Sequence, residues 1–263
     1  MTTDRNSYSS ITKAIGLFGG VKLFQILVSL IKNKLVAILL GPTGMGINGM
    51  IMSTTALISS LTNFGLQVSA VRDVSKAYTS NDEDTINQTV SVLRRLVLFT
   101  GLLGTILTFI FASWLSQWAF GDESYTNAFR LVSVVLFLDQ VCIGQTVLLQ
   151  GTFNYKYMAK ASFWGSILGL IISIPIYYIW HFEGIVPVII LTSLANLLLS
   201  TYYSRKIPYK KQQLSIKETF KKGRVMLLLG LALASTGIMD NGKIYLLRLV
   251  IAHFGDLADV GLY

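Results

Sequence analysis

Seven long apolar runs, separated by short polar connections, dominate the hydrophobic pattern of this chain. Each run supplies the roughly 20 residues with which an α-helix crosses about 30 Å of hydrocarbon. The pattern therefore predicts an all-α fold, a polytopic integral membrane helical bundle. The predicted spans are Ala14–Leu40, Gly44–Val71, Leu96–Phe120, Ala128–Leu149, Ala161–Trp180, Gly184–Tyr203 and Val225–Phe254.

The composition agrees with a membrane protein. Of the 263 residues, 52% are hydrophobic and 13% are charged, whereas a soluble domain usually has about 25% charged residues. The first run is too long for a cleaved signal peptide, contains Lys22 and precedes no small-x-small cleavage site. The single cysteine, Cys142, lies in an apolar run, and no Cys and His spacing suits a metal. We therefore expect no intramolecular disulfide, no metal and no other cofactor.

Basic residues occur in alternate connections. Gly41–Thr43, Gly121–Asn127 and His181–Glu183 contain no Lys or Arg, whereas Ser204–Arg224 is the most basic connection. Because basic loops stay on the cytoplasmic side, this asymmetry places the N-terminus in the cytoplasm. Lysines beside a membrane reflect topology and anionic lipid headgroups, so we expect no nucleic-acid partner. The basic residues of the last connection are Arg205, Lys206, Lys210, Lys211, Lys217, Lys221, Lys222 and Arg224.

The first span carries a polar, cationic stripe. A charge at the centre of a bilayer costs about 2.5–3.5 kcal/mol on insertion scales, so such residues usually face protein, water or a ligand. Gln25, Ser29, Lys32 and Asn33 fall within roughly 80° of Lys22 on a helix. Lys32 and Lys34 lie near the outer end of this run, where their long side chains can equally well reach the interface.

Other ionisable residues extend this pattern to the later spans. Asp240 and Lys243 are three residues apart and can pair on one helix face. Asp139 and Asp240 are candidates for binding a coupling proton or cation, because burial moves carboxylates toward neutral-pH titration. Bases outnumber acids in these spans, which favours an anionic substrate. The candidate substrate-binding residues of this cationic cavity are Lys22, Lys34, Arg72, Lys243 and Arg248.

The ends of the first and last spans resemble each other. Lys34–Gly41 has a cation, Leu-Val, apolar residues and then Gly, and Arg248–Gly255 repeats this order 214 residues later. A further glycine follows each segment, Gly46 and Gly261. The repeat predicts two homologous lobes of about six helices each, a common transporter plan.

This plan divides the chain into three parts. Residues 1–204 form the N-terminal six-span lobe, residues 205–224 form a basic cytoplasmic linker, and residues 225–263 contain the first helix of a second lobe. On this interpretation the chain is a fragment or a truncated gene product. A complete seven-span protein is the alternative.

Short glycine-based motifs occur in an order and spacing that resemble a known family over essentially the whole chain. The family is the Wzx group of lipid-linked oligosaccharide flippases, and the resemblance is greatest to its O-antigen translocase and lipid III (enterobacterial common antigen) flippase branch. The motifs are Lys34-Leu35-Val36-Ala37 before Gly41-Pro42-Thr43-Gly44-Met45-Gly46, Arg94-Arg95, Gln150-Gly151-Thr152-Phe153, Glu183-Gly184-Ile185, and Arg248-Leu249 before Asp259-Val260-Gly261-Leu262-Tyr263.

The resemblance implies a specific function. Members of this family form two-lobed bundles of about twelve helices around a central cationic cavity in the bacterial inner membrane. They transfer an undecaprenyl-diphosphate-linked glycan from the cytoplasmic to the periplasmic leaflet for lipopolysaccharide and other surface polysaccharides. A glycan polymerase and chain-length proteins are the implied protein partners. In an alternating-access cycle, Lys22, Lys34, Arg248 and Arg72 would hold the diphosphate and acidic sugars.

Two other classes of function are considered. The Wzx flippases belong to the multidrug/oligosaccharidyl-lipid/polysaccharide exporter superfamily. A drug or cation antiporter of that superfamily predicts a cavity dominated by acids, whereas bases dominate here. An integral-membrane glycan enzyme needs catalytic groups, often on a large periplasmic loop. The outer connections are short, and no paired carboxylates or nucleophile–base pair occurs in the sequence. We therefore expect a transporter that is not an enzyme.

Overall fold

The computed structural model describes residues 2–210 and 212–263, with side chains described from Gly19 onward. Lys211 of the predicted basic linker lies outside the described residues. Helices make up almost all of the described chain, which contains no strand, and the predicted all-α fold is confirmed. The helices are α1 (Thr2–Thr62), α2 (Leu66–Thr79), α3 (Glu83–Ile110), α4 (Ala112–Phe120), α5 (Thr126–Gly151), α6 (Tyr155–Trp180), the 3₁₀ helix η1 (His181–Gly184), α7 (Ile185–Ser204), α8 (Ile216–Phe254) and α9 (Leu257–Leu262).

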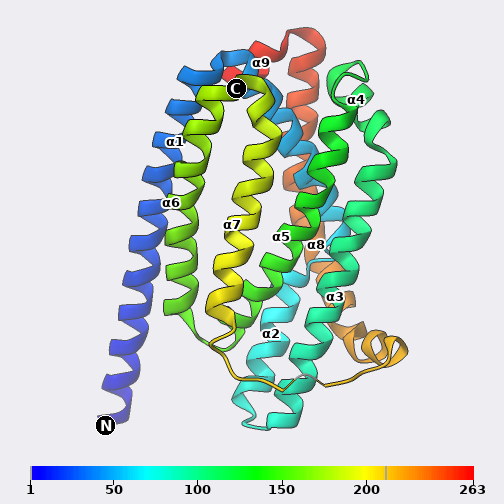
Figure 1. Ribbon diagram of the computed structural model, residues 1–263. Coiled ribbons are helices and arrows are strands. Elements are labelled where there is room, and N and C mark those ends of the chain that lie inside the picture. The colour runs from blue at the N-terminus through cyan, green and yellow to red at the C-terminus, as the bar shows by residue number, and fades with distance from the viewer. Residues whose placement is uncertain (1, 211) are drawn as a thin grey trace.

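The long helices agree with the predicted membrane spans. In the part of the chain that the structure describes, five continuous helical stretches are long and apolar enough to cross a bilayer. Two of them double back, at Gly41 and at η1, so each contains two of the predicted spans (Figure 1). Gly41 adopts φ 65° and ψ −177°, a conformation that glycine reaches without steric cost, and Pro42 follows it. The protein is therefore a multi-pass membrane protein.

Two predicted spans differ from the observed helices. The run Gly44–Val71 is interrupted after Thr62, where Phe64 and Gly65 have positive φ, and α2 then continues toward the basic end. The run Leu96–Phe120 is interrupted at Phe111 between α3 and α4. Both breaks lie in apolar sequence, so hydrophobicity alone gave no sign of them.

Apolar side chains pack into clusters at the two ends of the bundle. One cluster joins α2, α3, α5 and the start of α8 through residues such as Leu66, Leu93, Leu148 and Met226. A second cluster joins both arms of α1 to α5 and α7, and a third joins α1, α4, α5 and α9. The clusters hold the helices together around a more polar middle.

The basic linker is hydrogen-bonded to the N-terminal half of α3. The backbone N–H of Lys210 donates to Asn87 Oδ1 at 2.7 Å, and that of Gln212 donates to Ser91 Oγ at 3.0 Å. Arg95 donates to the backbone carbonyl of Leu214. Because these bonds fix its backbone, the segment that leads into α8 crosses the lower end of the molecule along a defined path (Figure 1).

The turn after Gly41 and the turn before α9 meet at the opposite end of the molecule. A Cβ added to Gly46 would overlap the carbonyl oxygen of Leu257, and one added to Gly261 would overlap that of Pro42. Gly46 and Gly261 were matched by the sequence repeat, and their contacts are reciprocal. Glycine is needed at both positions because two backbones touch there. The division into two lobes itself stays a prediction.

Candidate functional site

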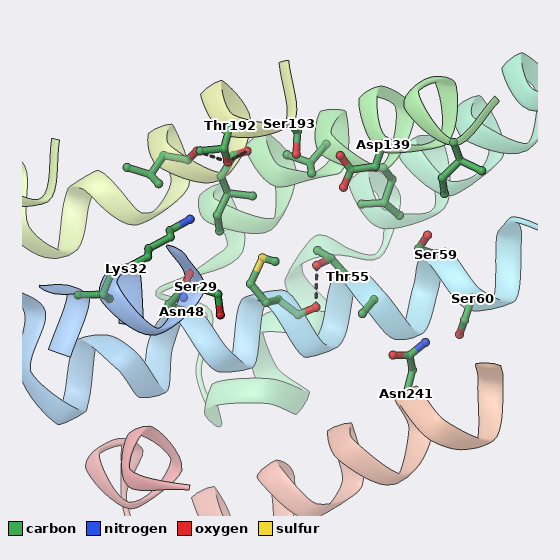
Figure 2. Close-up of a pocket in the computed structure, with 18 of the residues that line it drawn as sticks. Ser29, Lys32, Asn48, Thr55, Ser59, Ser60, Asp139, Thr192, Ser193 and Asn241 are labelled. Carbon is green, nitrogen blue, oxygen red and sulfur yellow. Dashed lines mark hydrogen bonds between the residues drawn. The ribbon is translucent and has the colours of Figure 1, made fainter. Parts of the chain in front are cut away.

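A polar cavity of about 650 Å³ lies inside the bundle, between both arms of α1, α5, α7 and α8 (Figure 2). Its volume is in the range of ligand-binding pockets. Part of its wall is apolar and belongs to the α1–α5–α7 cluster, including Val36, Val135 and Tyr177. The polar lining residues are Ser29, Lys32, Asn33, Asn48, Thr55, Ser59, Ser60, Asn63, Gln67, Asp139, Thr192, Ser193 and Asn241.

Two charged residues face this cavity. Lys32 extends from the first arm of α1, and Asp139 comes from the middle of α5 (Figure 2). Both side chains are half-buried, and the Ser193 hydroxyl of α7 lies within hydrogen-bonding reach of the Asp139 carboxylate. No ion pair joins these two described residues. The cavity therefore presents one cation and one anion, each without an oppositely charged protein partner.

Several hydroxyl groups of the cavity donate to carbonyl oxygens of their own helices. Thr55 donates to Ile51 O at 2.9 Å, Ser60 to Leu57 O at 2.7 Å, and Thr192 to Val188 O at 2.7 Å. This agrees with the expected behaviour of Ser and Thr in membrane helices. Since their protons are used in this way, these hydroxyls offer mainly acceptor lone pairs to the cavity.

The donors of the cavity are fewer. Its asparagines can both donate and accept, and the Lys32 ammonium has three donor hydrogens. Figure 2 shows Lys32 and Asn48 at one end of the cavity and Asn241 of α8 at the other. An elongated ligand could therefore interact with donors at both ends. Within the described residues, no three His, Cys, Asp or Glu side chains gather as a metal site would require.

The structure brings one of the predicted site residues, Asp139, into this cavity. Lys22, Lys34 and Arg72 are exposed and do not line it. Asp240 and Lys243 form the predicted pair, with Nζ 3.6 Å from Oδ1, on a face of α8 where both side chains are 74% exposed. That face points away from the helices that pack against α8.

Arg248 lies apart from the cavity, against the second arm of α1. Its Nη1 donates to the carbonyl oxygen of Gly49 at 2.5 Å. Its Nε is buried and has no partner in the described structure. A Cβ added to Gly49 would lie 3.4 Å from the guanidinium carbon, so the arginine packs closely on this part of α1. Arg248 therefore joins α8 to α1.

Lys32 is the cavity residue that the sequence left unresolved. Its place near the end of an apolar run allowed both a cavity position and an interfacial one. Its neighbours on the predicted stripe, Ser29 and Asn33, also line the cavity, whereas Lys22 does not. The polar residues Thr192, Ser193 and Asn241 were missed because isolated hydroxyl and amide groups in apolar helices usually serve packing.

Comparisons with known proteins agree with this architecture. No curated protein matches the sequence. Among solved structures, the chain is similar to an inward-facing multidrug resistance MATE family transporter of the MOP superfamily, with a TM-score of 0.67 and 16% identity. The match covers 90% of this chain and 56% of that one, so this chain spans little more than half of the transporter's length.

The likeness to the solved transporter establishes the fold. The family follows from the sequence itself. The profile of one family, described as polysaccharide biosynthesis protein, matches residues 35–263, which is most of the chain and includes α2 to α9. The chain therefore belongs to the polysaccharide biosynthesis protein family and has the fold of a MOP-superfamily membrane transporter.

Proposed function

We propose that this chain is part of a flippase that moves an undecaprenyl-diphosphate-linked oligosaccharide, of the O-antigen or enterobacterial common antigen type, across the bacterial inner membrane. The observation that carries the proposal is the polar cavity at the centre of a transporter fold in a polysaccharide biosynthesis family. Such a cavity offers a wet path for a hydrophilic head group whose lipid tail stays in the bilayer.

The proposed chemistry assigns separate roles to the two charged residues of the cavity. Lys32 binds a diphosphate oxygen as a compact cation. Asp139 binds a coupling proton or cation, since it faces the cavity without a basic partner. Lys32 thus joins the earlier candidates, and Lys22, Lys34, Arg72, Lys243 and Arg248 stay proposed substrate contacts that act outside this cavity, with Asp240 as the second coupling carboxylate.

The proposal also includes orientation and partners. The N-terminus and the basic linker lie on the cytoplasmic side, where the linker lysines meet anionic headgroups. The glycan emerges on the opposite side, where a glycan polymerase and chain-length proteins receive it. A drug or cation antiporter is the second candidate, because Asp139 gives the cavity an anion that an organic cation could bind.

The test uses the full-length gene product in a bacterium that lacks its own copy of the gene. We expect Lys32→Gln to lower surface glycan by about tenfold or more at normal protein level, since a lost charge contact of about 1.4 kcal/mol is worth that factor. Arg130→Gln, at an exposed position at the start of α5, is the control and should leave surface glycan unchanged.

Two results would reject the flippase. One is normal surface glycan in cells that lack the gene altogether. The other is export of a cationic dye that depends on Asp139 while surface glycan does not, which would support the antiporter. Lys22→Ala tests the stripe separately, and normal surface glycan at normal protein level would remove Lys22 from the mechanism.

A further inference from the structure

A second cavity, of about 500 Å³, opens at the end of the molecule opposite to the basic linker. It lies between the end of α4 and the turn from α8 to α9, which appear at the upper end of Figure 1. Because the predicted orientation places the basic linker in the cytoplasm, this groove would face the outer side of the membrane. It does not include any residue of the central cavity.

The floor of this outer groove is aromatic. Trp118 lines it and is 55% exposed, although it stacks on Trp114 with ring centroids 4.6 Å apart. Phe120 also lines the groove and is held by Tyr125, whose ring centroid is 4.0 Å away. These contacts fix two rigid apolar surfaces before any ligand arrives.

Polar groups surround the aromatic floor, and most are already oriented by the protein. The side-chain amide nitrogen of Gln117 donates to Glu123 Oε1 at 2.7 Å, which leaves the side-chain amide oxygen, Oε1, for a ligand. Asp256 accepts the N–H groups of Ala258 and Asp259 through one oxygen, Oδ1, and its other oxygen stays free. His253 is exposed on the same wall.

The lining excludes one class of ligand and favours another. No Lys or Arg is among the residues that line this described groove, and Asp256 gives it an anionic group. A diphosphate would therefore be repelled. A sugar ring instead has a C–H face that packs on an aromatic surface and an equator of hydroxyls that both donate and accept.

We propose that this outer groove binds a neutral sugar unit of the translocated glycan, with Trp118 as the stacking platform and Asp256, His253 and Gln117 as hydroxyl partners. The proposal rests on the proposed flippase function, because it names where the glycan lies once its diphosphate has left the central cavity. Position at the membrane surface alone would make Trp118 an interfacial anchor like Trp114. What distinguishes Trp118 is that it lines the groove, whereas Trp114 does not.

A second exposed tryptophan, Trp180 at the end of α6, does not line the groove and supplies a matched control for Trp118. The purified full-length gene product, fluorescently labelled in detergent, is applied to an array of neutral oligosaccharides and of oligosaccharides that contain uronic or sialic acid. We expect binding to neutral oligosaccharides, reduced about tenfold by Trp118→Ala and changed less than about twofold by Trp180→Ala. His253→Ala, at an exposed position that leaves packing intact, should weaken binding by several fold.

The possible outcomes distinguish a failure of the proposed sugar site from a failure of the proposed flippase function. Sugar binding at the outer groove would be overturned by any of three results. These are no binding to neutral oligosaccharides, a preference for acidic ones, or equal losses in the two tryptophan variants. Such a result would leave the flippase standing if surface glycan still depends on Lys32. Conversely, binding that depends on Trp118 in a protein whose loss does not change surface glycan would keep the sugar site and reject its role in flipping.

Discussion

Polar residues at the inner end of the bundle and those in the central cavity differ in the partners that the protein gives them. At the inner end each has a partner in the protein, as Asn87 and Ser91 have in the linker backbone and Arg95 has in the Leu214 carbonyl and the Thr219 hydroxyl. In the cavity, Lys32 and Asp139 line the open volume and form no ion pair with a described residue. In the sequence, the inner end is marked by many polar and basic residues, whereas the polar residues of the cavity are scattered in apolar helices.

The difference shows how to tell a structural polar group from a functional one in this protein. A buried polar group that is paired contributes to stability, and its removal leaves the partner unsatisfied. A polar group that faces a cavity without a partner contributes little to stability and is available to a ligand. Variants at the two places should therefore change different observables.

The largest expected effect is on transport. We expect Asp139→Asn to reduce surface glycan per molecule by about tenfold or more, equivalent to about 1.4 kcal/mol, because the amide cannot carry the coupling charge. The melting temperature in detergent should stay unchanged, since Asp139 faces the cavity and forms no ion pair with a described residue. A variant that unfolds at a lower temperature but transports normally would show that Asp139 contributes to stability and not to transport.

The next effect is on stability at the inner end. Arg95→Ala removes a charged donor from Leu214 and Thr219, and a hydrogen bond to a charged group contributes about 1.5–3 kcal/mol. We expect a lower melting temperature and lower abundance, with normal transport per remaining molecule. Lys217→Ala, an exposed neighbour at the start of α8, serves as the control. Impaired transport at unchanged stability would place Arg95 in the mechanism.

A smaller loss is expected between α5 and α7. The hydroxyl of Ser204 donates to Gln145 Oε1 at 2.6 Å, and both side chains are buried. Ser204→Ala leaves the amide oxygen without this donor and should lower the unfolding free energy by about 1 kcal/mol. Thermal denaturation compares it with Ser235→Ala, whose exposed hydroxyl bonds only to its own helix. Equal melting temperatures in the two variants would contradict the structural role.

The smallest expected effect is on the pH dependence of stability, through Asp82 at the N-terminus of α3. Hydrogen bonds from the Thr85 hydroxyl and from backbone N–H groups lower the pKa of the exposed Asp82 below its ordinary value of 3.8. The ionised Asp82 carboxylate therefore stabilises the folded state fully above pH 3.8, and this stabilisation is lost as the pH falls through the lower pKa of the folded state. Asp82→Ala should lower the melting temperature at pH 7, and this disadvantage should shrink as the pH falls below 3.8. A difference that grows in acid would contradict this cause.

The membrane fold could be read from the sequence because it depends on local chemistry. A run of some 20 apolar residues must become a helix in lipid, where every backbone group needs an internal partner. Each predicted span therefore has a counterpart, from α1 to α8. The breaks at Asn63–Gly65 and Phe111 were not predicted, because they depend on contacts such as the one between Gly65 and the Gly230 carbonyl.

The candidate site was predicted only in part. Asp139 was chosen because a carboxylate in an apolar run is costly wherever it lies, and the structure places it in the cavity. The ionisable residues of α8 were chosen on the same ground, yet Asp240 and Lys243 face away from this cavity. Hydrophobicity reports depth in the membrane but does not report which neighbour a helix face will meet.

The sequence by itself determined that this protein crosses the membrane many times, with helices that carry costly polar groups and a repeated turn at Gly41 and Gly255. Only the tertiary structure decided that Lys32, and not Lys22, joins Asp139 at one cavity. The physical reason is that the cost of a buried charge is a property of one residue. The position of a cavity depends on how several helices, far apart in sequence, leave space between them.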